Sequence, residues 1–152
     1  MRALIQRVTK ASVTVGEKKI SMIGQGLLVY LGVNTDDEPS DISYTAKKVA
    51  GLRIFNDDSG KMQKSVKDID GEVLVVSEFT LYGDCKKGRR PNFIQAARPE
   101  KAKNYYNEFC HLLHEAGIKS VKTGVFGAMM AVTCCNDGPV TLLLQSPSEL
   151  NK

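Results

Sequence analysis

The chain has 152 residues, of which 42% are hydrophobic and 25% charged, and its formal net charge is +4. These totals predict one globular domain over residues 1–152, and the mildly basic charge permits a polyanionic partner without requiring one. No apolar run is long enough to span a bilayer and no signal peptide opens the chain, so we expect a cytoplasmic protein with no membrane partner.

The first part of the chain is predicted to be β structure. Within residues 2–33, three strand-like runs are separated by glycine-containing turns. Residues 11–15 alternate well between apolar and polar side chains, and residues 20–23 form a second run. Residues 27–33 are apolar throughout, which predicts a central strand covered on both faces.

Two amphipathic helices are predicted from the spacing of apolar residues. The first has Pro39 near its first turn and ends at Gly51. The second begins at residues 98–100 and runs to about Ala116, with a broad apolar face. Two long helices among many strands indicate a mixed α/β domain.

Residues that usually build metal or acid–base sites are sparse. His111 and His114 fall on the polar side of the second helix, which indicates surface residues and removes the usual general base. None of the cysteines forms a C-x-x-C pair, so we expect reduced thiols. Residues 56–60 are a tight turn and not a calcium loop, because the twelfth position counted from Asn56 is Lys67. We therefore predict no metal and no cofactor.

Residues 73–79 are predicted to form a buried strand that becomes polar at its end. Ser77, Glu78 and Thr80 place two hydroxyls and a carboxylate there, before the stop at residues 83–84. A buried strand can hold reactive groups on a rigid support in this way. Strand-end hydroxyls also commonly satisfy local backbone groups, and this stretch alone leaves both interpretations open.

The most basic segment of the chain follows that strand. Lys86, Lys87, Arg89 and Arg90 give four cations within five residues, and the aromatic Phe93 lies nearby. This composition would suit a phosphate backbone, and it would equally suit a solvated loop.

The C-terminal part is predicted to be two strands, residues 129–135 and 140–145, joined by a turn. In that turn, Gly138 before Pro139 would expose two carbonyl oxygens rigidly, although a plain hairpin turn has the same composition. The polar tail, residues 146–152, is expected to be frayed.

Several of these stretches together resemble the D-aminoacyl-tRNA deacylases, also called D-tyrosyl-tRNA deacylases. The resemblance covers almost the full length with the motifs in order: residues 1–8, 77–81, 87–91, 124–130 and 136–141. It implies a three-layer α/β/β domain with largely antiparallel sheets and two main helices, working as a homodimer. It also implies that residues 77–80 of one subunit face the Gly-cis-Pro motif, Gly138 and Pro139, of the other.

The resemblance further assigns roles to single residues. Arg7 would steady the Gly-cis-Pro turn, and Phe126 and Met130 would line the pocket for the terminal adenosine of tRNA. Where the family has glutamine this chain has Glu78, and an ionised carboxylate accepts hydrogen bonds but cannot donate them. We therefore expect backbone N–H groups around Phe79 and Thr80 to stabilise the oxyanion.

The implied activity is hydrolysis of D-aminoacyl-tRNA, and of mischarged glycyl-tRNA, as chiral proofreading in translation quality control. The substrate's own 2′-hydroxyl would help to activate water, and the rigidly held carbonyl oxygens of Gly138 and Pro139 would reject L-amino acids by steric clash. No DNA partner is expected. Two alternatives remain: a non-catalytic RNA-binding module using residues 86–90, and a generic esterase with Thr80 or Ser77 as nucleophile, which would lack a base.

Overall fold

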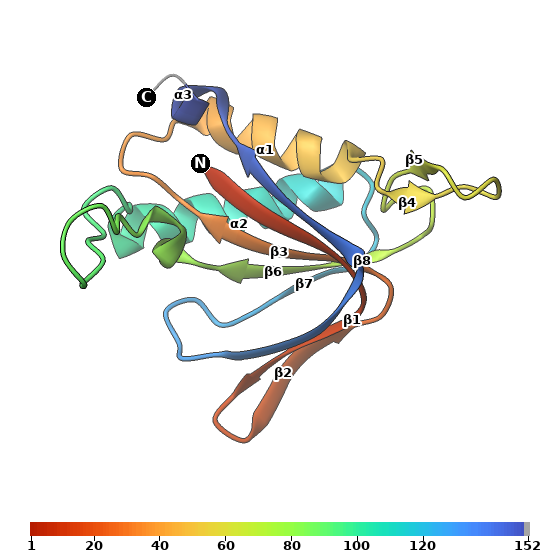
Figure 1. The fold of residues 1–152 in the computed structure, drawn as a ribbon, viewed down its shortest axis with the longest axis horizontal. Helices are drawn as coiled ribbons and strands as arrows, with labels where there is room; N and C mark the ends of the chain where they lie inside the picture. Colours follow the sequence, from red (N-terminus) through yellow and green to blue (C-terminus); the bar gives the residue numbers. More distant parts are fainter. Residues whose placement is uncertain (151–152) are drawn as a thin grey trace.

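Six strands form the main sheet of the computed structural model, which describes residues 1–150, and a hairpin, two long helices and two short helical turns complete it (Figure 1). The sheet strands are β1 (Arg2–Val15), β2 (Lys18–Ile23), β3 (Gly26–Gly32), β6 (Glu72–Ser77), β7 (Val121–Thr123) and β8 (Ala131–Gln145). The hairpin is β4 (Phe55–Asn56) and β5 (Met62–Lys64), and the helical elements are α1 (Pro39–Gly51), the 3-10 helix η1 (Phe79–Tyr82), α2 (Pro99–Glu115) and α3 (Pro147–Leu150). Within residues 1–150, the helices all fall short of the length and apolarity that a bilayer crossing needs.

The long strand β1 organises the sheet. One edge of β1 pairs antiparallel with β3 over residues 2–8 and with β2 over residues 11–15, and its other edge pairs antiparallel with β8. Strands β3, β6 and β7 run parallel, because α1 connects β3 to β6 and α2 connects β6 to β7. The last residues of β6 are therefore presented at one end of a sheet that is fixed on both sides.

Side chains of the central strands alternate between two hydrophobic clusters. In β6, Val73 and Val75 join the cluster that α1 and α2 cover, whereas Leu74 and Val76 join a second cluster. The second cluster is closed by the far half of β1 and by β2 and β8, which curl across the other face of the sheet (Figure 1). Successive residues of a strand point to opposite faces, so a strand that contributes to a cluster on each face must be apolar at every position.

Both predicted helices are present at the predicted positions. The helix α1 begins at Pro39 behind a capping box, in which the Glu38 N–H donates to the Asp41 carboxylate at 2.9 Å. The helix α2 begins at Pro99 and buries Tyr106, Phe109 and Leu113. The apolar spacing was sufficient for these elements because their buried faces repeat every turn.

Two expectations about element ends were wrong. Strand β6 ends at Ser77, and the next residues form η1 instead of continuing the strand to residue 79. Residues 146–150 are not frayed: Ser146 is fully buried, and the Glu149 carboxylate accepts from Arg2 Nε at 2.8 Å. The remaining tail, residues 151–152, lies outside the described residues.

The Glu72 carboxylate ties the β2–β3 turn to the segment before β7. It accepts from the Gly24 N–H at 2.6 Å and from the Ser120 hydroxyl at 2.7 Å, and the Gly24 N–H is the main reason that the pKa of Glu72 is lowered. A carboxyl whose pKa is lower in the folded state stabilises the fold above its unfolded pKa of about 4.3, and this contribution is lost as pH falls through the folded pKa.

We expect Glu72→Gln to lower the free energy of unfolding by about 1 kcal/mol at pH 7, because a charged acceptor is replaced by a neutral one. Below about pH 3 the two proteins should be nearly equal, since protonated Glu and Gln are similar in shape and charge. Urea unfolding at both pH values measures this, with the exposed Glu108→Gln as control. An equal loss at both pH values would contradict it.

Candidate active site

The end of β6 holds a carboxylate and a hydroxyl in fixed positions. Ser77 pairs with Leu31 of β3, and the Glu78 N–H donates to the Leu31 carbonyl at 2.8 Å. Glu78 is the N-cap of η1, and its Oε1 accepts from the Thr80 hydroxyl and from the Thr80 N–H, the latter at 3.4 Å. The strand is buried up to Val76, so the polar groups emerge together at the surface.

The two main-chain groups expected to stabilise an oxyanion differ in what they face. The Thr80 N–H is directed at the Glu78 carboxylate, whereas the Phe79 N–H belongs to the first residue of η1. The Phe79 ring is 54% exposed and packs edge-on against Phe93, with ring centroids 5.0 Å apart. Of the two N–H groups, the Thr80 N–H is therefore the one that already has a partner in the Glu78 carboxylate.

Residues 137–140 form a corner within β8, and not a turn between two strands. Asn136 pairs with Val8 and Thr141 pairs with Gln6, so both flanks of the corner lie along β1. The prediction of two strands joined by a turn is wrong, and so is the alternative of a plain hairpin turn, because four residues of the single strand β8 loop out opposite Arg7. The Gly138–Pro139 peptide bond in this corner is cis.

The corner is anchored by the buried Arg7 side chain of β1 and by partly buried side chains of β8. The Arg7 side chain, 9% exposed, lies 2.9 Å from the Asp137 carboxylate through Nε and donates to the Ile54 carbonyl through Nη1 at 2.6 Å. Asn136 Nδ2 donates to the carbonyls of Arg7, at 2.9 Å, and of Val140, at 3.0 Å. The anchors leave Pro139 itself exposed.

Gly138 has no room for a side chain. Its φ is +115°, and an added Cβ would lie 2.9 Å from Val140 Cγ2 and 3.0 Å from Arg7 Nη2. The sequence pointed to Arg7, Gly138 and Pro139 but missed Asn136 and Asp137, which clamp the corner. The available signal was their residue type, since Asn and Asp side chains commonly bond neighbouring backbone in turns.

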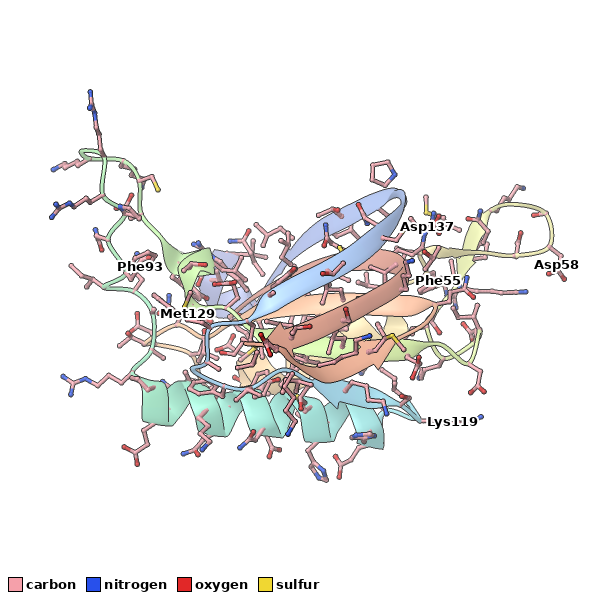
Figure 2. The ribbon with its side chains drawn as sticks, turned by 90° about the horizontal axis from the view of Figure 1, so that it is seen from below. Phe55, Asp58, Phe93, Lys119, Met129 and Asp137 are labelled. Atoms are coloured by element: carbon pink, nitrogen blue, oxygen red, sulfur yellow. The ribbon has the colours of Figure 1, made fainter. Side chains whose placement is uncertain are left out.

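The corner and the end of β6 lie at opposite ends of the molecule. Figure 2 shows Asp137 beside Phe55 at one end, and Phe93 and Met129 toward the other. Arg7 is level with Val73 of β6, so Ser77 lies four residues, about 13 Å, further along the sheet. Three strand spacings from β8 to β6 add about 14 Å across it. One chain therefore does not bring these two predicted parts together.

The two residues expected to line an adenosine pocket pack against different clusters. The Phe126 ring lies 6.0 Å from the Tyr106 ring, between centroids, against the helix-covered cluster. Met130 packs against the second cluster, and its Sδ accepts from the Val125 N–H at 3.4 Å. Both lie in the connection between β7 and β8, where their neighbour Met129 is 92% exposed.

The basic segment follows η1 directly. Asp84 and Asn92 exchange backbone hydrogen bonds of 2.8 and 3.0 Å, closing a loop that carries the cations away from the body of the molecule (Figures 1 and 2). The side chains of Lys86, Lys87, Arg89 and Arg90 in this loop are all exposed. The structure thus places four exposed cations in the loop that follows β6 and η1.

Other titratable groups near the site or in the core are explained by burial or by contacts with neighbouring residues. The pKa of Tyr30 is raised by burial and then by the charges of Cys134 and Glu78. His111 is exposed and lies 3.2 Å from Glu115, as expected for a surface residue. The pKa of the Cys110 thiol is raised to about 12 by burial. Among residues 1–150 no cluster of His, Cys, Asp or Glu could hold a metal ion.

Comparison with known proteins gives concordant matches over nearly the whole chain. A family model described as D-Tyr-tRNA(Tyr) deacylase matches residues 4–145. A D-aminoacyl-tRNA deacylase of Thermotoga petrophila is 58% identical over 146 residues, which cover 96% of this chain and 97% of the relative. One of Chloroherpeton thalassium is 51% identical over 152 residues and covers 100% of both chains.

Two solved structures resemble the fold. The c-Myc DNA unwinding element binding protein superposes with a TM-score of 0.91 at 45% identity, covering 97% of this chain and 99% of that one. A probable eukaryotic D-amino acid tRNA deacylase has a TM-score of 0.81 at 19% identity, covering 94% and 97%, which supports the fold alone.

Proposed function

The chain belongs to the D-Tyr-tRNA(Tyr) deacylase family, and from this premise we propose that its ester hydrolysis takes place in sites shared by two copies of the chain. The activity itself is that of a D-aminoacyl-tRNA deacylase, a hydrolase of translation quality control. The observation that carries the proposal is the separation between the anchored corner and the end of β6. A small ester cannot contact both parts of one chain, so a second copy must supply one of them.

We propose a homodimer in which the corner of each protomer reaches the end of β6 of the other. Support comes from β8, an edge strand whose Leu142 and Leu143 are 39% and 56% exposed. Exposed apolar residues on an unpaired edge are a liability that a two-fold contact would cover. The two clusters on opposite faces of β6 support the proposed three-layer α/β/β arrangement.

The proposed chemistry uses main-chain groups. The Phe79 N–H would bind the ester carbonyl as it becomes an oxyanion, with Ser77 and Thr80 forming the wall of the site. One well-placed donor contributes about 10²–10³ in rate. An aminoacyl ester is already activated by its α-ammonium and by the neighbouring 2′-hydroxyl, which would help to activate water, so a modest catalyst is sufficient.

Chiral selection in this proposal is steric. The carbonyl oxygens of Gly138 and Pro139 from the partner would occupy the space that an L side chain needs, while a D side chain would point away from them. Glycine has no side chain to reject, so glycyl-tRNA would also be a substrate. Because L side chains are rejected by clash and D side chains are not contacted, the enzyme would accept D-amino acids with many kinds of side chain.

We propose that the tRNA end is held by the loop of Lys86, Lys87, Arg89 and Arg90 through its phosphates. Phe126 and Met130 would contribute to binding the terminal adenosine from the two sides of the β7–β8 connection. In this proposal the enzyme acts on tRNA in the cytoplasm and uses no DNA partner, metal or cofactor.

The direct test is to incubate the protein with D-Tyr-tRNA, L-Tyr-tRNA and Gly-tRNA and to follow ester loss. We expect D-Tyr-tRNA and Gly-tRNA to be hydrolysed and L-Tyr-tRNA to be spared by about 10²-fold or more, because a steric clash is hard to relieve in an anchored corner. Equal rates on both tyrosyl esters would overturn steric selection. Binding of tRNA without ester loss would indicate an RNA-binding module, and hydrolysis of simple aryl esters alone would indicate a generic esterase.

A further inference from the structure

The Glu78 carboxylate is fixed at the strand end but is not neutralised. Both bonds that it makes within residues 1–150, from the Thr80 hydroxyl and the Thr80 N–H, are to Oε1, which leaves Oε2 for a ligand. No ion pair within residues 1–150 involves Glu78. The side chain is only partly buried and is therefore open to a bound molecule.

A carboxylate is an unexpected neighbour for an oxyanion site. Negative charge that develops on the ester oxygen at the Phe79 N–H would be disfavoured by a second negative charge one residue away. A substrate that brings its own positive charge removes this penalty. In an aminoacyl ester the α-ammonium is attached to the carbon next to the reacting carbonyl, so it arrives beside Glu78 whenever that carbonyl lies at Phe79.

We propose that Glu78 is a specificity-determining residue that binds the free α-ammonium of the substrate and restricts this enzyme to esters with an unblocked amino group. The inference rests on the proposed function, because it requires the ester to be bound at Phe79. Esters whose amino group is acylated, such as peptidyl-tRNA, carry no cation and would leave the Glu78 carboxylate uncompensated beside the oxyanion. They would be excluded by charge, independently of the chirality of the residue.

The geometry that positions Glu78 is local and tolerates a neutral amide. The side-chain oxygen of a glutamine at this position can accept the same two bonds from Thr80, so Glu78→Gln removes the charge and keeps the cap. The variant therefore separates the charge of the residue from its structural role.

The experiment compares wild type and Glu78→Gln on D-Tyr-tRNA and on N-acetyl-D-Tyr-tRNA at about pH 6.5, where the α-amino group is protonated. We expect Glu78→Gln to lower kcat/KM on D-Tyr-tRNA by about tenfold or more, as for loss of a hydrogen bond to a charged group. On the acetylated substrate the variant should equal or exceed wild type. Glu108→Gln, on the exposed face of α2, should change neither rate.

Three outcomes decide the matter. A drop confined to the free-amine substrate supports the assignment of Glu78. If Glu78→Gln changes kcat/KM by the same factor on both substrates while wild type still hydrolyses D-Tyr-tRNA, the assignment of Glu78 is overturned and the proposed function is not. A merely structural residue would affect both esters in this way. Failure of wild type to hydrolyse D-Tyr-tRNA at all overturns the proposed function and this inference with it.

Discussion

Replacing Gly138 with alanine should lower kcat/KM on D-Tyr-tRNA by about 10²-fold or more while the chain remains folded. The added Cβ would meet Val140 and Arg7 at 2.9 and 3.0 Å, and the φ of +115° is one that L side chains rarely adopt. Relief of this strain must move the corner, because the Arg7 side chain beneath it is held to Ile54 and Asp137. In the proposed dimer, a displaced corner would no longer meet a substrate in the partner's site.

The stability of the domain should survive this change. A strained backbone residue costs about 1–3 kcal/mol, which is less than the roughly 5–15 kcal/mol that is typical of a folded domain. Urea unfolding gives the cost and steady-state hydrolysis gives the loss of activity. Gly16→Ala is the matched control, because Gly16 also has positive φ, +58°, but nothing lies within 4 Å of an added Cβ. Full activity of Gly138→Ala would remove the corner from the mechanism.

What the sequence predicted well is what repeats locally. The helices from Pro39 and from Pro99 were located because apolar residues recur at helical spacing, and β6 because it is continuously apolar. Gly138 and Pro139 of the corner were also found, since Gly followed by Pro is a local signal. Its shape was missed, because the pairing of residues 131–136 and 141–145 with the same strand depends on a partner more than a hundred positions away.

The same limit explains the C-terminal residues. A polar tail is normally solvated, but here the Glu149 carboxylate accepts from Arg2 and from the Tyr82 hydroxyl, at 2.8 and 3.1 Å for the two donors. Burial, followed by the charges of Asp37 and Glu149, raises the pKa of Tyr82, so its hydroxyl stays protonated and donates. These partners lie far apart in the chain, and composition alone does not pair them.

The Glu78 carboxylate shows where the resemblance and the residues diverged. From the sequence, a carboxylate in place of glutamine could only be excluded as an oxyanion donor. The structure adds that this carboxylate occupies the Thr80 N–H and hydroxyl, which shifts the proposed oxyanion role toward Phe79. Side-chain rotation at a strand end depends on its neighbours in space, and the pattern of the sequence does not report it.

If the Phe79 N–H is the oxyanion donor, Phe79→Pro should lower kcat/KM on D-Tyr-tRNA by about 10²–10³-fold. Proline removes this N–H and suits the first position of a helix, and the preceding Glu78, with φ −142° and ψ 88°, lies outside the α region that a following proline disfavours. Phe79→Ala, which keeps the N–H, should lose much less. Thr80→Ala should also retain activity, because Thr80 is proposed only as part of the wall of the site. Complete loss of activity with intact folding would instead favour Thr80 as the nucleophile. Equal activity of the proline and alanine variants would contradict the main-chain mechanism.

Mixing the two inactive variants then decides whether each site is shared between protomers. In a mixed dimer of Gly138→Ala and Phe79→Pro, one site combines two altered parts and the other combines two intact parts. Random reassortment makes half of the dimers mixed, so about a quarter of the wild-type sites should be recovered. Each variant alone has every site altered. If the corner instead served its own chain, every site in the mixture would contain one altered part and no activity would return, so recovery on mixing can arise only from a corner that acts across the interface.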